Sequence, residues 1–213
     1  MVSIYLLRHG ESEMNLRLAE IVSGRSNHTP LTEKGYAQAR AAGEWLAQHH
    51  IVPTLTIASP AVRTRETLAT CLKAMDITVP TVIDDRLQEI SHGRMEGQPR
   101  PEVWNEERRA LLAKDPLHYA LPGGESIVDV QQRKMDWLQD LVDRYPDEQV
   151  ILAAGHGYAI KSLVGHFLDW DHAHITYVAH TPNCSLTHIT YDGTSFTVEY
   201  VGRDIVAELA ETT

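Results

Sequence analysis

The sequence predicts an α/β protein: a three-layer α/β/α sandwich with a mostly parallel sheet and a C-terminal antiparallel hairpin. The first observation is that short apolar segments alternate with amphipathic segments, as in a parallel sheet with helices on both faces. The second is that two apolar segments end in His-Gly, at residues 9–10 and 156–157. The third is a pair of alternating segments around Asp192-Gly193, which predicts a hairpin.

In the first half of the chain, apolar runs, their breakers and one capping residue predict the elements. Thr32 is a candidate N-cap, so a helix is expected to begin after it. The predicted buried face of that helix is Ala37, Ala41 and Trp45, with Ala42 and Leu46 beside it. The elements are, in order, a strand over 2–8, an irregular segment to Pro30, the helix after Thr32, a strand over 55–58 ended by Ser59-Pro60, a helix over about 61–75 and a strand over 79–83.

A strongly amphipathic helix dominates the second half, from about Ser126 to Tyr145, and Pro146 ends it. Its apolar stripe consists of Ile127, Val130, Trp137, Leu138, Leu141, Val142 and Tyr145. The other predicted elements are one short helix near 101–114 in a loop-rich segment over 84–126, a strand over 149–154, a helix over about 158–168 and the closing hairpin. The Asp192-Gly193 turn of the hairpin favours type I′.

Length and charge limit the function classes. The 213 residues suit a single domain over 1–213, and the net charge of −10 argues against nucleic acid or an anionic membrane as partner. No segment approaches the roughly 20 apolar residues of a membrane span. Cys71 and Cys184 are the only cysteines, and such sparse use fits a reducing compartment, so a cytoplasmic location is expected. The oligomeric state is open, and a homodimer is one option.

Reactive side chains follow the two His-Gly strands. One strand ends in Arg8, His9 and Gly10, and the other ends in His156 and Gly157. If both strands are parallel members of one sheet, the two imidazoles lie at the same edge, where α/β proteins place their ligands. The two glycines are expected to leave room for an anion to approach the backbone.

Two further polar residues complete a set that suits phosphoryl transfer. Arg63 follows Ser59-Pro60 at the start of a helix, and Glu89 lies in the segment after the third strand. Phosphoryl transfer needs positioning and cationic stabilisation of spread negative charge, and a guanidinium can hold two oxygens at once. A neutral imidazole can act as the nucleophile, and neighbouring arginines disfavour its protonation.

Five motifs and their order along the chain resemble the histidine phosphatase superfamily, which includes the cofactor-dependent phosphoglycerate mutases. The motifs are LLRHGES, SPAVRTRETL, RLQEISHGRMEG, PGGES and AAGHGYAIKSL. The resemblance spans most of the chain. It implies that His9 is the phospho-accepting nucleophile, that Arg8, Arg63 and His156 hold the phosphoryl oxygens, and that Glu89 is the general acid. It also implies that Asn15, Ser23, Gly24 and Gly157 contact the substrate.

Some positions depart from the family pattern or allow another interpretation. His28 stands where the family often has Asp, and the segment from Asn15 to Gly24 is about two residues longer than expected, which leaves specificity and the role of Ser23 open. Glu11 and Glu96 are alternatives to Glu89 as the acid. The histidines at 49–50 and 172–174 lack the spacing of a closed metal site, so no metal and no cofactor is expected.

The sequence therefore predicts a metal-independent phosphatase that hydrolyses small phosphomonoesters through a phosphohistidine on His9, with a small phosphorylated metabolite as substrate. The alternative is a cofactor-dependent phosphoglycerate mutase, which the segment after Glu89 and the short chain disfavour. A binding module that has kept the fold without turnover is a third interpretation, and the presence of nucleophile, acid and cations argues against it.

Overall fold

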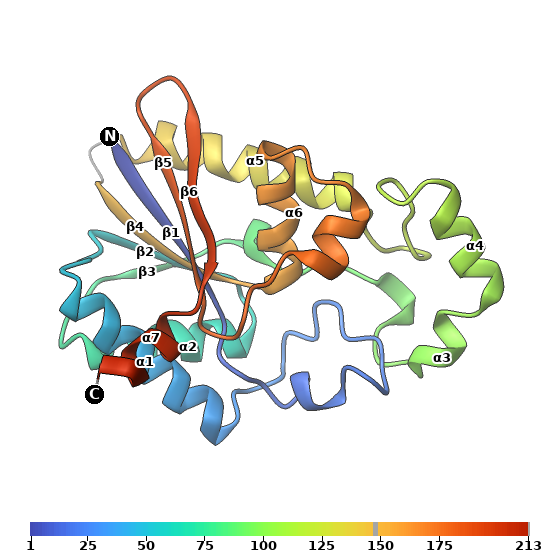
Figure 1. Ribbon diagram of the computed structural model, residues 1–213, viewed down its shortest axis with the longest axis horizontal. Coiled ribbons are helices and arrows are strands. Elements are labelled where there is room, and N and C mark those ends of the chain that lie inside the picture. The colour runs from blue at the N-terminus through green and yellow to red at the C-terminus, as the bar shows by residue number, and fades with distance from the viewer. Residues whose placement is uncertain (147–148, 213) are drawn as a thin grey trace.

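The sheet of the computed structural model has six strands in the order β3-β2-β4-β1-β5-β6 (Figure 1). The structure describes residues 1–146 and 149–212. β1 to β4 run parallel, β5 is antiparallel to β1, and β6 is antiparallel to β5, so the predicted mixed sheet is confirmed. The strands are β1 (Val2–Arg8), β2 (Leu55–Ala58), β3 (Thr81–Ile83), β4 (Val150–Gly155), β5 (Leu186–Tyr191) and β6 (Phe196–Arg203).

Helices cover both faces of the sheet, as the three-layer prediction requires (Figure 1). One layer contains α1 (Glu33–Gln48), α2 (Val62–Ala74) and α7 (Ile205–Thr212), and the other contains α5 (Ile127–Arg144) and α6 (Gly157–Phe167). α3 (Arg100–Val103) and α4 (Glu106–Lys114) lie in a segment that projects from the sheet. Short helical turns occupy Asn15–Arg17, Asp85–Leu87, Gly93–Met95 and His174–Val178. No helix of the described residues is long and apolar enough to cross a membrane.

The central strand β1 divides the core in two because successive side chains of a strand point to opposite faces. Ile4 and Leu6 pack with α5 and α6, whereas Leu7 packs with α1, α2 and α7. All three side chains are buried. A strand with apolar residues on both faces is typical of a sheet covered on both sides, and it fixes the position of the polar residues that follow it.

The ends of β1 and β4 bring the two His-Gly segments together. The strands are paired in parallel, with Arg8 opposite Gly155. The backbone N–H of His9 donates to the carbonyl of Gly155 at 3.0 Å. Both imidazoles therefore follow the same edge of the sheet, and His156 is also the N-cap residue of α6.

Two predicted elements have different bounds. The helix expected near 101–114 is two helices, α3 and α4, because the Asn105 side chain accepts from the backbone N–H of Arg108 at 3.0 Å and starts a new helix. The strand expected over 79–83 begins only at Thr81, since Pro80 has no N–H to donate to a ladder.

The C-terminal region also differs from the prediction. Asp192-Gly193 begins a four-residue loop rather than a type I′ turn, because only Gly193 in the loop has positive φ, at 104°. The Asp192 carboxylate accepts from the backbone N–H groups of Thr194 and Ser195, which stabilises the longer loop. The chain ends in α7 rather than in the hairpin, and the side chain of Asp204 accepts from the N–H of Ala207 at its start.

Candidate active site

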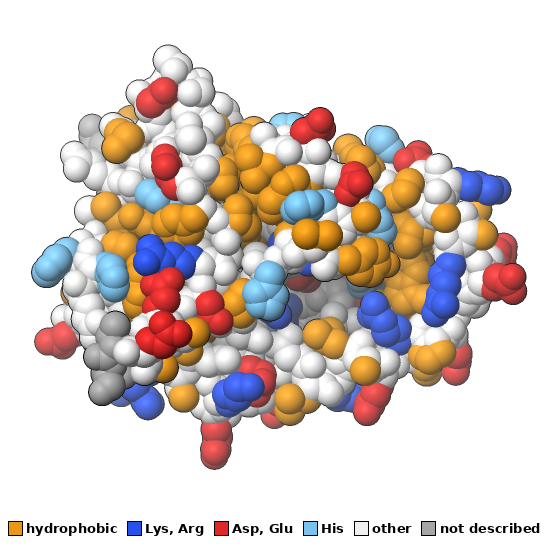
Figure 2. All heavy atoms as spheres, viewed as in Figure 1, with side chains coloured by type: hydrophobic (Ala, Val, Ile, Leu, Met, Phe, Trp, Pro, Cys, Tyr) orange, Lys and Arg blue, Asp and Glu red, His pale blue; other side chains and the backbone are white. Residues whose placement is uncertain are grey.

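A cavity of about 1040 Å³ lies at the sheet edge where β1 and β4 end. In the space-filling view it is a hollow between the body of the protein and the α3–α4 segment (Figure 2). It is lined by eight of the nine predicted site residues: Arg8, His9, Asn15, Ser23, Gly24, Arg63, Glu89 and Gly157. The ninth, His156, lies next to them, outside the lining.

The His9 ring is oriented with one nitrogen toward the protein. Its Nδ1 lies 2.7 Å from the carbonyl oxygen of Gly10, and a carbonyl only accepts, so Nδ1 carries the hydrogen. In the neutral ring Nε2 then holds a lone pair. Burial, followed by the charges of Arg63 and Arg8, holds the pKa of His9 well below its usual 6.5. The ring is thus kept in the neutral form that a nucleophile needs.

Arg63 is held by two loop carbonyls and one imidazole. Its guanidinium donates to the backbone oxygens of Ser26 and Arg25 at 2.8 and 2.9 Å, and to Nδ1 of His156 at 3.0 Å. The residue is only 3% exposed. Burial lowers its pKa to about 10, so the side chain stays cationic near neutral pH. The loop that lines the cavity therefore also fixes the orientation of this cation.

His156 uses both ring nitrogens within the protein. Because Nδ1 accepts from Arg63, Nε2 carries the hydrogen and donates to the hydroxyl of Ser59 at 2.9 Å. The ring lies edge-on to that of His9, with centroids 5.3 Å apart. Burial is the main cause of a pKa well below 6.5, and the charge of Arg63 adds to it. In this arrangement His156 orients Arg63. Direct contact of His156 with a phosphoryl oxygen stays a prediction.

Arg8 presents an unpaired donor at the cavity. Its Nη1 donates to the carbonyl of Thr181, whereas its buried Nε has no hydrogen-bond partner among the described residues. A buried guanidinium nitrogen without a partner is costly, and an anion in the cavity would satisfy it. A Cβ atom at Gly157 would lie 3.0 Å from this Nε, so the glycine keeps space beside the guanidinium.

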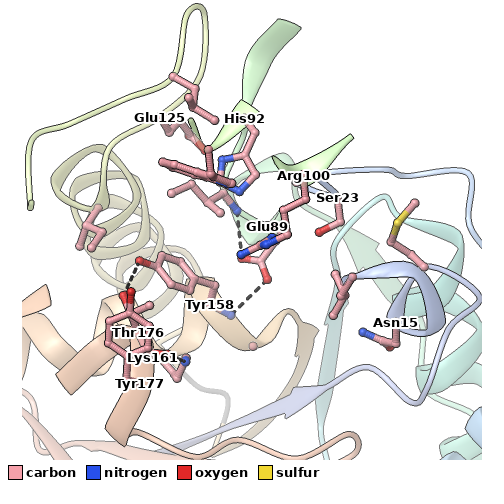
Figure 3. A pocket seen from close by; sticks show the side chains of 18 of the residues that line it. Asn15, Ser23, Glu89, His92, Arg100, Glu125, Tyr158, Lys161, Thr176 and Tyr177 are labelled. Atoms are coloured by element: carbon pink, nitrogen blue, oxygen red, sulfur yellow. Dashed lines mark hydrogen bonds between the residues drawn. The ribbon is translucent and has the colours of Figure 1, made fainter. Parts of the chain in front are cut away.

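Glu89 is fixed at the start of α6. Its carboxylate accepts from the backbone N–H groups of Ile90, Tyr158 and Ala159 at 2.9, 3.1 and 2.8 Å. Figure 3 marks two of these bonds. These bonds leave it facing the cavity, which it lines. A positioned carboxyl of this kind can exchange a proton with a bound substrate.

The other two candidate acids lie outside the cavity lining. Glu11 forms an ion pair with Lys34 at 2.9 Å and accepts from Thr32. Glu96 accepts from the backbone N–H groups of the loop at 25–26 and of His92, so it holds that loop against the segment after Glu89. The geometry therefore favours Glu89 over both alternatives.

Three of the predicted substrate contacts, Asn15, Ser23 and Gly24, line the wall opposite α6, whereas Gly157 lies in α6 beside Arg8 (Figure 3). The Asn15 oxygen accepts from the N–H of Ser12 at 2.9 Å, which turns the amide group toward the cavity. Ser23 and Gly24 belong to the loop that holds Arg63, and Gly24 has a φ of +52° that favours glycine. A Cβ atom there would also lie 2.3 Å from the carboxylate of Glu96.

The expected role of Gly10 was wrong, because this residue does not line the cavity. A Cβ atom on Gly10 would lie 2.5 Å from the carbonyl oxygen of Gly35 in α1. The glycine is therefore required by the close approach of α1 and not by an anion.

Sequence reasoning missed several residues that support the site. Ser59 was identified only as a strand breaker, yet its hydroxyl accepts from His156. Asn183 donates to the backbone oxygen of His9 at 3.0 Å. Glu125 was not missed, since it belongs to the PGGES motif, for which substrate contact was left open; it lines the cavity and pairs with Arg133 and Arg25 at 2.8 and 3.2 Å. Lys161 had a usable signal, since it follows Gly157 by one helical turn and also lines the cavity.

No group of three or more His, Cys, Asp or Glu side chains within residues 1–146 and 149–212 is placed to hold a metal ion. Cys71 and Cys184 are buried free thiols, and burial raises the pKa of Cys71 to about 12. Metal independence stays a prediction.

Comparison with known proteins gives the family. A sequence model of the histidine phosphatase superfamily (branch 1) matches residues 4–204. A 2,3-bisphosphoglycerate-dependent phosphoglycerate mutase of Methylobacterium sp. (strain 4-46) is 31% identical over 170 residues, which cover 76% of this chain and 78% of the relative. The structure of Bacillus stearothermophilus YhfR is 30% identical, with a TM-score of 0.83, and the match covers 96% of this chain and 100% of that one.

The fold is also that of the alpha-ribazole phosphatase from Shigella flexneri, with a TM-score of 0.79 at 22% identity over 95% of this chain and 97% of that one. The match of the superfamily model, which extends over nearly the whole chain, agrees with the order of the motifs and with the site at the strand ends. The chain belongs to the histidine phosphatase superfamily.

Proposed function

We propose that this protein is a phosphatase that hydrolyses phosphomonoesters through a phosphohistidine on His9, without a metal ion. The observation that carries the proposal is the buried, neutral His9 ring, with its Nε2 lone pair free beside two guanidinium groups in a cavity that also contains Glu89. Nucleophile, cations and proton donor are the parts that metal-free phosphoryl transfer requires.

The reaction has two steps. Nε2 of His9 attacks phosphorus, a P–N bond forms, the ester P–O bond breaks, and Glu89 gives its proton to the leaving oxygen. Water then attacks the phosphorus, Glu89 takes a proton from it, and the P–N bond breaks with return of its electron pair to His9. Arg8 and Arg63 stabilise the charge on the non-bridging oxygens in both steps.

Phosphoglycerate mutase activity is the second candidate, because the curated relative at 31% identity carries that name. In a mutase the phosphoryl group on His9 returns to a sugar acid, whereas in a phosphatase it passes to water. The two activities share the first step and the same residues. The acceptor in the second step is therefore the property that an experiment has to measure.

Two assays test the proposal. Inorganic phosphate should be released from p-nitrophenyl phosphate by the purified protein, and an identically purified His9→Ala variant should release none. In the second assay 3-phosphoglycerate and a trace of 2,3-bisphosphoglycerate are supplied together. Phosphate release at a rate well above formation of 2-phosphoglycerate supports the phosphatase, and the opposite ratio would establish the mutase.

A further inference from the structure

The cavity extends well beyond the cations that face the phosphoryl group, toward the α3–α4 segment. Its lining there is mainly apolar, and the side chains that form this apolar wall are Met14, Leu18, Trp104, Leu112, Tyr119 and Leu121. Figure 2 shows apolar side chains on this side of the hollow. The apolar wall is therefore part of the same space in which a substrate would be bound.

The wall has a small core of its own. Val22, Val103 and Leu121 form a buried cluster separate from the two cores of the sheet, and Trp104 and Tyr119 pack against it. The rings of Trp104 and Tyr119 have centroids 6.4 Å apart, and that of His92 lies 6.2 Å from Trp104. Packed rings keep their positions, so the wall is a formed surface rather than a chance exposure of apolar groups.

The size of the cavity agrees with an extended leaving group. Its volume of about 1040 Å³ is slightly above the roughly 300–1,000 Å³ of pockets for small organic ligands. A phosphoryl group with a three-carbon acid would leave the apolar wall uncovered. Burying apolar surface of the leaving group against it would supply binding free energy.

The charges along the cavity disfavour one kind of leaving group. Arg100 of α3 and Arg109 of α4 line the cavity on the side of the apolar wall, and Lys161 lines it one helical turn after Gly157. The carboxylates among its described lining residues are those of Glu89 and Glu125, and the latter is paired with two arginines. The remaining charge in this part of the cavity is positive, which disfavours a cationic substituent on the substrate.

We propose that the preferred substrates are phosphomonoesters whose leaving group is an apolar body, alkyl or aromatic, that carries no positive charge and lies against the apolar wall. This inference rests on the proposed phosphatase function, because it names the substrate class of the same site.

The test is a series of n-alkyl phosphates from ethyl to octyl, whose leaving groups differ little in basicity. The value of kcat/KM should rise by up to about fourfold for each added methylene that becomes buried, the ratio that corresponds to about 0.8 kcal/mol. A flat series would overturn the inference. A second test compares 3,3-dimethylbutyl phosphate with phosphocholine, whose leaving group has the same shape but carries a positive charge. The value of kcat/KM should be higher for 3,3-dimethylbutyl phosphate. A higher value for phosphocholine would contradict the proposed exclusion of positive charge.

Two adjacent leucines on α4 provide a matched comparison. Leu112 lines the cavity, whereas Leu111 is 43% exposed and does not. Leu112→Asn should lower the octyl-to-ethyl ratio of kcat/KM several-fold, and Leu111→Asn should leave that ratio at its wild-type value. Equal ratios in both variants and the wild type would contradict the placement of the leaving group on this wall.

Alkylphosphonates of the same lengths separate this inference from the proposed function, since they bind without being hydrolysed. Their affinity, measured by calorimetry, should rise with chain length. If no phosphomonoester is turned over and the phosphonates still show this rise, the phosphatase proposal fails and the preference for apolar groups stands. If phosphomonoesters are turned over and the affinity for the phosphonates does not change with chain length, the phosphatase proposal stands and the preference for apolar groups fails.

Discussion

Replacing Glu89 with Gln tests the role of the carboxyl through two separate measurements. The carboxylate accepts three backbone N–H bonds, at 2.8 to 3.1 Å. A glutamine whose oxygen keeps the bonds from Ile90 and Ala159 turns its NH₂ group toward the N–H of Tyr158, so that one bond is lost. A hydrogen bond to a charged group contributes about 1.5–3 kcal/mol. At 2–4 °C per kcal/mol for a domain of this size, Tm should fall by about 3–12 °C.

The kinetic effect should depend on the leaving group. An alkoxide needs a proton as the P–O bond breaks, and general acid catalysis is worth about 10²–10⁴ in rate. A nitrophenolate leaves readily without that proton. Glu89→Gln should therefore slow the phosphorylation of His9 by an alkyl phosphate by about 10²–10⁴, and slow phosphorylation by p-nitrophenyl phosphate much less.

Single-turnover kinetics by rapid quench are the appropriate assay, because Glu89 also acts as the base in the proposed second step. Glu96→Gln is the matched control. Glu96 likewise accepts backbone N–H bonds but lies outside the cavity lining, so its loss should slow both substrates by the same factor. Equal slowing of both substrates in Glu89→Gln would refute the reasoning and leave Glu89 a positioning role.

Three further predictions concern the nucleophile, its neighbour and the absence of a metal requirement. Burial, Arg63 and Arg8 lower the pKa of His9. The rate of His9 phosphorylation at saturating substrate should therefore persist below pH 6.5 and decline only at lower pH. A decline centred at or above pH 6.5 would contradict the proposal that His9 reacts as a neutral imidazole. Ser59→Ala removes the acceptor for Nε2–H of His156, the ring that accepts from Arg63. The value of kcat should fall about tenfold, which corresponds to the loss of about 1.4 kcal/mol of hydrogen bonding. An unchanged kcat would show that the bond from His156 to Ser59 does not orient Arg63. Dialysis against EDTA should leave kcat/KM unchanged and vanadate should inhibit competitively, whereas activity lost to EDTA and restored by Mg²⁺, Mn²⁺ or Zn²⁺ would contradict metal independence.

Most of the fold could be predicted because apolar runs and helix caps are local signals. Thr32 caps α1 through the N–H of Gly35, and Ser126 caps α5 with Asp129 in a capping box. The predicted face of α1 was confirmed at Ala42, Trp45 and Leu46, which are buried, but it was wrong at Ala37, which is exposed. The helix packs through its glycines: a Cβ atom at Gly43 would lie 2.3 Å from the carbonyl of Cys71. Apolar periodicity does not count glycines, so this close contact of two helices was invisible to it.

A polar residue can also hide part of a buried face. Lys134 lies in the apolar stripe of α5 between Val130 and Leu138, is almost fully buried, and contacts the ring of Trp137. Burial lowers its pKa to about 7. Lysine side chains are mostly exposed in proteins, and only the packing of α5 against the sheet reveals the place of this one.

The candidate site was predictable in its members but not in their connections. The motif order and the parallel strands placed His9 and Glu89 at the cavity. The bond from Arg63 to His156, and from there to Ser59, depends on contacts between residues more than 90 positions apart. Side-chain geometry over such separations is set by tertiary packing, which local sequence patterns do not encode.

The most direct test of the central claim is to trap the phosphoryl group on the enzyme. A ³²P-labelled phosphomonoester is mixed with excess protein, the reaction is quenched in alkali within milliseconds, and the labelled peptide is identified. A phosphohistidine should be found at His9, stable in alkali and lost in acid, and His9→Ala should carry no label and show no turnover. Wild-type turnover in His9→Ala, or a label on any other residue, would contradict the mechanism.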